Sequence, residues 1–152
     1  MPEGKVVSSR VDLNRMLEEL AKHSAMGAGG LALFIGVVKG VVDGRRVREL
    51  EYEAYEPHAS RALGEIAREE ASREKVLDVR VYHRVGRLKP GEPTLYIAVA
   101  AVDRKTALEA LSRVLERVKH EPPVFKLERR EDGEFWVVGD GKRVKRGQGG
   151  SS

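Results

Sequence analysis

Two consecutive prolines, Pro122 and Pro123, constrain this chain more than any other feature, because a helix cannot continue through them. They are bracketed by Lys119, on the last turn of a predicted helix, and Lys126, on the segment that leaves the turn. Such a bend can aim two ammonium groups at one point. Each then lowers the pKa of the other, so that one becomes a nucleophilic amine near neutral pH. The alternative is a pair of solvated surface lysines, and the motif alone favours that alternative.

The composition indicates a single soluble domain. A chain of 152 residues is long enough for one proper core, and 34% charged residues predict a heavily charged surface. The absence of cysteine excludes disulfides, thiolate metal sites and cysteine nucleophiles. The four histidines are scattered without the spacing of a metal site. No apolar run approaches the ~20 residues of a membrane span, and the N-terminus lacks the apolar core of a signal peptide. We therefore expect a cytoplasmic protein with no metal.

Basic residues are concentrated near the C-terminus. The net charge is +4, and without Lys142, Arg143, Lys145 and Arg146 the chain has 24 basic and 24 acidic residues. We expect one domain over residues 1–140 and a basic, Gly/Ser-rich flexible tail over 141–152. A basic tail can bind nucleic acid. That alternative ranks last, because the chain lacks exposed aromatic residues interleaved for base stacking.

Strand-like and helical segments alternate along the chain. Helices are expected over 11–23, from Pro57 onward, and in a third segment for which Asp103 is a good N-cap. The expected strands are 5–8, 31–39, 47–55, 76–85, 94–102, 124–130 and 134–138. Asp43-Gly44 and Asp132-Gly133 are hairpin turn signals. The pattern predicts an α+β fold, with an antiparallel sheet, three main helices and a small β unit near the C-terminus.

Lys39, Asp103 and Arg104 are candidates for binding a ligand. Lys39 follows Gly36 at the end of a buried strand, where glycine permits either close approach of a ligand or a simple bend. Arg104 begins a helix and can hold phosphate through two hydrogen bonds. We expect Asp103 to be a plain N-cap, because a carboxylate weakens an anion site.

His83 is a candidate acid or base, since histidine titrates near neutral pH. It shares the alternation of its strand with Val81 and Val85. We expect it on the solvent face of that strand.

Four segments together resemble the large, catalytic subunit of molybdopterin synthase, over most of the chain from about Gly30 to Val138. Each segment is only moderately specific, but their order and spacing are highly specific. They are residues 34–39 (Phe-Ile-Gly-Val-Val-Lys), 50–55 (Leu-Glu-Tyr-Glu-Ala-Tyr), 83–92 (His-Arg-Val-Gly-Arg-Leu-Lys-Pro-Gly-Glu) and 119–126 (Lys-His-Glu-Pro-Pro-Val-Phe-Lys).

The resemblance implies an α/β hammerhead fold with an added β subdomain. It implies a sulfurtransferase that forms the dithiolene of molybdopterin from cyclic pyranopterin monophosphate, without a cofactor. The sulfur donor is the thiocarboxylated C-terminal Gly-Gly of a small ubiquitin-like subunit. Two large subunits form a central homodimer, with one small subunit at each end.

The resemblance also assigns roles to residues. Lys119 and Lys126 are the catalytic pair, and Lys39 and Arg104 bind phosphate. The remaining residues of the implied substrate pocket are Val37, Val38, Asp103, Leu127 and Glu128. The family often has His where this chain has Asp103, and commonly Arg where it has Lys39. A non-catalytic relative that only binds a ubiquitin-like partner is therefore the alternative.

Overall fold

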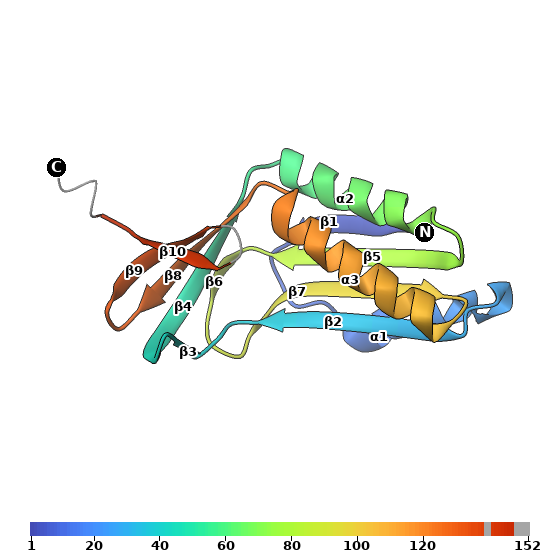
Figure 1. The fold of residues 1–152 in the computed structure, drawn as a ribbon, viewed down its shortest axis with the longest axis horizontal. Coiled ribbons are helices and arrows are strands. Elements are labelled where there is room, and N and C mark those ends of the chain that lie inside the picture. Colours follow the sequence, from blue (N-terminus) through green and yellow to red (C-terminus); the bar gives the residue numbers. More distant parts are fainter. Residues whose placement is uncertain (139–140, 148–152) are drawn as a thin grey trace.

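Two sheets form the framework of the protein (Figure 1). The computed structural model describes residues 1–138 and 141–147. The first sheet has the strand order β1 (Glu3–Val7), β5 (Val76–Arg84), β7 (Pro93–Ala101) and β2 (Gly30–Val37). The second has the order β10 (Lys142–Lys145), β9 (Gly133–Val138), β8 (Val124–Arg130), β4 (Arg45–Ala54) and β3 (Val41–Val42), with β6 (Gly86–Leu88) also paired to β4.

Helices cover both faces of the first sheet. On one face α2 (His58–Ala71) and α3 (Arg104–His120) lie side by side (Figure 1). Leu63, Ile66 and Val114 from these helices pack with Val99 in one fully buried cluster. On the other face α1 (Leu13–Ala21), continued by the 3-10 turn η1 (Lys22–Met26), buries Met16 and Leu20 against Tyr96. The predicted α+β class, the three main helices and the added β subdomain are confirmed.

One strand pairing differs from the prediction of an antiparallel sheet. β1 pairs parallel with β5, whereas β2 and β5 both pair antiparallel with β7. Apolar alternation indicates which residues of a strand face the core, but it does not fix the direction of its neighbour. The sheet is therefore mixed, with its parallel pair at one edge.

Part of the basic C-terminal segment, which we expected to be a flexible tail, forms a strand. Lys142–Lys145 form β10, antiparallel to β9, with Val144 opposite Trp136. Gly141 has φ 95, which glycine adopts without strain. Arg143 and Arg146 form ion pairs with Glu128 and Glu134. The Gly/Ser-rich residues 148–152 lie outside the described residues.

The turns that position α3 and β8 follow the predicted chemistry. Asp103 caps α3 by accepting a hydrogen bond from the Thr106 backbone N–H at 2.8 Å. The helix ends at His120, and β8 begins directly after the Pro122-Pro123 turn. Within residues 1–138 and 141–147, we find no helix with the length and apolar character needed to cross a membrane.

Candidate functional site

Cations from three other parts of the chain act on the amine of Lys126. Lys126 is the third residue of β8 and is partly buried, and Lys119 lies on the last turn of α3. Burial lowers the pKa of Lys126, and so do the positive charges of Arg143, Lys119 and Lys39, whereas the Glu128 carboxylate opposes them. We name Lys39, Lys119, Lys126 and Arg143 the cationic cluster. The structure thus adds Lys39, which the sequence analysis proposed separately, to the pair of Lys119 and Lys126.

The backbone beside Lys39 is fixed by a neighbouring loop. The Val38 N–H donates to the Glu92 carbonyl at 3.0 Å, and the Val38 carbonyl accepts from the Gly91 N–H at 2.9 Å. The Val38 side chain is buried, whereas that of Val37 is exposed. These two hydrogen bonds fix the backbone that follows β2, and so they fix the position of the Lys39 backbone.

Leu127 and Glu128 continue β8 beyond Lys126, and both are buried. The two carboxylate oxygens of Glu128 accept hydrogen bonds from Arg143, at 3.2 and 3.0 Å. This pair places the Arg143 guanidinium beside Lys126 and balances the charge of Glu128. Sequence reasoning missed Arg143 because it assigned residues 141–152 to a tail. The sequence held one indication of this pair. Glu128 lies two positions after Lys126 in a predicted strand, on the same face, and an acidic residue there calls for a basic partner.

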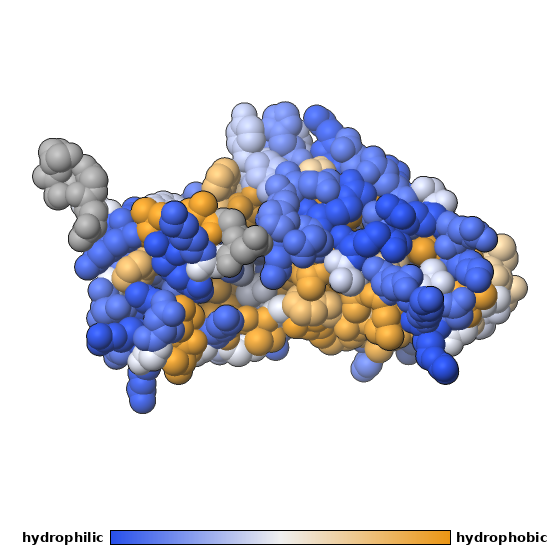
Figure 2. All heavy atoms as spheres, in the orientation of Figure 1, coloured by the Kyte–Doolittle hydropathy of each residue, from blue (hydrophilic) through white to orange (hydrophobic). Residues whose placement is uncertain are grey.

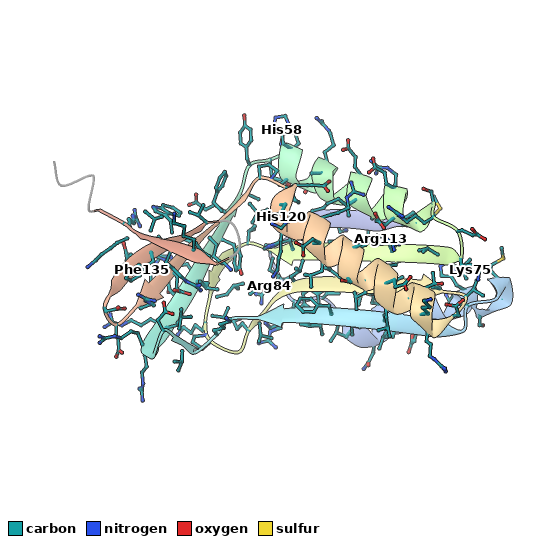
Figure 3. The ribbon with its side chains drawn as sticks, viewed as in Figure 1. His58, Lys75, Arg84, Arg113, His120 and Phe135 are labelled. Atoms are coloured by element: carbon teal, nitrogen blue, oxygen red, sulfur yellow. The ribbon has the colours of Figure 1, made fainter. Side chains whose placement is uncertain are left out.

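His83 is buried, so the prediction of a solvent-facing residue is wrong. It is only 8% exposed, and its ring meets the Tyr52 ring edge-on, with centroids 4.9 Å apart. The second sheet covers this end of β5, and burial lowers the pKa of His83. In Figure 3 the neighbouring Arg84 points into the region between the two sheets. Sequence reasoning thus named His83 but placed it on the wrong face, and it did not identify Tyr52, the ring that His83 contacts.

Asp103 and Arg104 lie at the opposite end of α3 from Lys119. Figure 3 shows the two ends, with Lys75 near the start of the helix and His120 at its end. Lys119 lies fifteen positions after Arg104 in the helix, about 22 Å along the axis. The hydrogen bond from Thr106 lowers the pKa of Asp103, and Lys75 lies 3.8 Å from its carboxylate. Within one chain, the structure does not bring Arg104 to the cationic cluster.

Two surface hollows lie outside the cationic cluster. The larger, of about 630 Å³, is lined at the start of α3 by residues that include Lys75, Arg104 and Lys105. The other, of about 270 Å³, is on the second sheet and includes Trp136 and Arg146. Lys119 and Lys126 line neither of them. Among residues 1–138 and 141–147, no three His, Asp or Glu side chains are placed to hold a metal ion.

The fold and the cluster together define a class of protein: an α+β domain that presents several cations at the junction of two sheets, as a binder of anions would. A profile of the MoaE protein family matches residues 6–121, and the chain belongs to this family.

Three comparisons illustrate the relationship. The molybdopterin synthase catalytic subunit of Pyrococcus abyssi is 37% identical over 123 residues, which is 81% of this chain and 83% of that protein. A molybdopterin synthase crystal structure from Staphylococcus aureus superposes with a TM-score of 0.78 at 29% identity, covering 91% of this chain and 98% of the other. A chain from the Helicobacter pylori complex of subunits 1 and 2 of molybdopterin-converting factor has the same fold, with a TM-score of 0.70, 19% identity, and coverage of 97% and 98%.

Proposed function

We propose that this chain is the catalytic subunit of a molybdopterin synthase. It transfers sulfur from the thiocarboxylated C-terminus of a small ubiquitin-like subunit to cyclic pyranopterin monophosphate, and forms the dithiolene of molybdopterin. Membership of the MoaE family supports this function. The observation that carries it is the placement of Lys119 at the end of α3 and Lys126 on β8, on either side of the Pro122-Pro123 turn, with the charges of Lys119 and Lys39 both felt by Lys126. A phosphate and a thiocarboxylate are both anions, and such a cluster suits both. The reaction takes place in the cytoplasm.

The two catalytic lysines have different roles. Lys119 stabilises the negative charge that develops on the terminal carbonyl of the small subunit during transfer, as a positioned cation does best where water is excluded. Lys126 holds the pterin and moves a proton, for which a lowered pKa is suited. Lys39 binds the phosphate, and the backbone of Val37 and Val38 lines the pocket with Leu127 and Glu128.

Arg104 contributes to the phosphate site from a second copy of the chain. β2 is an edge strand, with Gly30 packed near the Arg104 backbone at one end and Lys39 following its other end. The eight residues of β2 span about 26 Å, close to the ~22 Å between Arg104 and Lys119 along α3. Two β2 strands paired antiparallel about a two-fold axis would therefore place Arg104 of each copy near Lys39 of the other.

The exposed side chains of β2 suit such a homodimer. Leu31, Leu33 and Val37 are exposed by 41%, 37% and 55%. Figure 2 shows hydrophobic residues gathered along this edge of the first sheet, below the charged surface of the helices. A second copy would remove this apolar surface from water. In the same assembly, Asp103 lies next to the phosphate site and caps the helix that carries Arg104.

The test is reconstitution. The purified chain is mixed with an authentic thiocarboxylated small subunit and cyclic pyranopterin monophosphate, and the dithiolene product is measured. The expected result is product in proportion to the thiocarboxylate supplied. Absence of product from a correctly folded chain, when the Staphylococcus aureus enzyme succeeds in parallel, would contradict the proposal. Formation of a stable complex without product would instead support a non-catalytic binding protein.

A further inference from the structure

The ring of Tyr52 lies beneath the amine that the proposed reaction uses. Tyr52 on β4 is the direct cross-strand partner of Lys126 on β8, and the Lys126 Nζ is 5.8 Å from the centre of the tyrosine ring. The tyrosine is only 8% exposed. The face of an aromatic ring attracts a cation, and more strongly where water is excluded. Tyr52 therefore stabilises the protonated form of Lys126.

The Tyr52 ring is held in turn by His83. The imidazole meets the tyrosine edge-on, at an interplanar angle of 68°. Its Nδ1 lies 2.8 Å from the Arg84 carbonyl oxygen. A carbonyl oxygen only accepts hydrogen bonds, so Nδ1 carries the proton of the neutral ring. The backbone of the next residue thus fixes the orientation of the histidine, and the histidine limits how the tyrosine can turn.

Influences of opposite sign act on the proton of Lys126. Three cations, Arg143 on β10, Lys119 on α3 and Lys39 after β2, favour loss of its proton, as does burial. Glu128 on β8 and the Tyr52 ring favour the ammonium. His83, from β5, faces the same group as a neutral ring whose pKa is lowered by burial. Of the two groups that favour the ammonium, the Tyr52 ring is the uncharged one, and we call its effect the aromatic support.

We propose that His83 is a positioning residue that holds the Tyr52 ring beneath Lys126, and that this pair sets the pH at which Lys126 exchanges its proton. The proposal rests on the proposed function, in that the reaction uses Lys126. Neither His83 nor Tyr52 needs to touch the substrate. Their effect on turnover is transmitted through the lysine amine.

The experiment follows Lys126 directly. The protein is labelled with 13C at the lysine Cε, the Lys126 signal is assigned with Lys126→Arg, and its titration midpoint is measured by NMR. In Tyr52→Leu the midpoint is expected to fall by about half a pH unit, since the ring no longer stabilises the ammonium. Tyr52→Phe, which keeps the ring, is expected to leave it unchanged. His83→Ala is expected to behave like Tyr52→Leu, and His83→Phe, which restores a ring edge, like the wild type.

Tyr82→Leu is the matched control. The Tyr82 ring is also buried, on the adjacent residue of β5, and lies under a different lysine, with Lys5 Nζ 5.9 Å from its centre. Its loss should leave the Lys126 midpoint in place. An unchanged Lys126 midpoint in both Tyr52→Leu and Tyr82→Leu would overturn the inference. This comparison needs only the two tyrosine variants, so it can be made even if the histidine variants fail to fold.

Turnover is measured on the same variants. The pH profile of dithiolene formation should shift with the NMR midpoint, while the affinity for the small subunit stays constant. An NMR shift in a chain whose wild type makes no dithiolene would contradict the proposed function and leave the aromatic support standing. Normal turnover with no NMR shift in Tyr52→Leu would contradict the aromatic support alone.

Discussion

Arg143 grips both carboxylate oxygens of Glu128, at 3.2 and 3.0 Å, across a segment of chain that joins β8 to β10. Glu128 is 2% exposed, and a second ion-pair partner, Arg130, is more distant at 3.8 Å. The pair therefore ties β10 to the strand that carries Lys126. It also holds a positive charge close to that lysine.

Arg143→Ala should destabilise the protein, because it leaves a buried carboxylate without its principal donor. The free energy of unfolding is expected to fall by about 2 kcal/mol, as measured by denaturant titration. The pKa of Lys126 should rise, because one repelling cation is lost. Lys142→Ala, on an exposed residue of the same strand, is the control. Equal stability of the two variants would show that the Arg143–Glu128 pair does not stabilise the fold.

Lys119→Ala should abolish turnover without unfolding the protein. Lys119 is placed to stabilise charge in the transition state, and loss of one such group costs about a hundredfold to a thousandfold in rate. Dithiolene formation and thermal unfolding are measured side by side, with exposed Lys22→Ala as control. Turnover in Lys119→Ala at the wild-type rate would remove this lysine from the mechanism.

Lys126→Met should stabilise the fold at neutral pH. The pKa of Lys126 is lowered in the folded chain from its usual 10.5, chiefly by burial. The unfolded chain therefore binds the proton more tightly, and the wild type gains stability as pH rises from the folded-state pKa towards 10.5. The advantage of the methionine should be greatest below that interval and shrink across it. A difference that does not vary with pH would contradict the assignment of a lowered pKa.

Arg104→Ala and Lys119→Ala should complement each other if each site uses two copies of the chain. Both single variants are expected to be inactive. After unfolding and refolding as an equal mixture, half of the dimers contain one of each, and each of these has one intact site. Activity should then recover to about a quarter of the wild type, since closed symmetric dimers assort at random. No recovery, with mixed dimers confirmed by mass, would contradict a site that takes Arg104 from one copy and Lys119 from the other.

Asp103→Ala should lower the melting temperature by removing the cap of α3, whereas Asp103→Asn should retain it. The pKa of Asp103 is lowered from its usual 3.8 by the Thr106 N–H. The carboxylate therefore contributes stability above pH 3.8, and this contribution is lost as pH falls through the folded-state pKa. Thermal melts at neutral pH and in strong acid should show the alanine effect only at neutral pH. An effect of the same size in acid would contradict the capping role.

Local chemistry made several features predictable from the sequence. Asp43 and Gly44 have φ of 52 and 73, the left-handed values that their residue types tolerate in a tight hairpin. Asp103 caps its helix, and Pro122 and Pro123 follow the end of that helix closely, so Lys119 falls on its last turn. In each case one or two neighbouring residues determine the local backbone conformation.

Features that depend on distant pairing were not predictable. His83 is buried because the second sheet packs over the end of β5. The sequence around His83 contains no pattern that predicts this contact. Arg143 joins the cluster because Gly141 returns the chain alongside β9. By contrast, the separation of Arg104 from Lys119 follows from the two predicted ends of α3, although the family resemblance assigns both residues to one pocket.

A crystal structure of the chain with cyclic pyranopterin monophosphate tests the central claim most directly. The account predicts that the phosphate lies within hydrogen-bonding distance of Lys39 and Arg104 from two copies of the chain, with the pterin between Lys119 and Lys126. A substrate bound only at the hollow beside Lys75, or lysine amines that point away from it, would contradict the account.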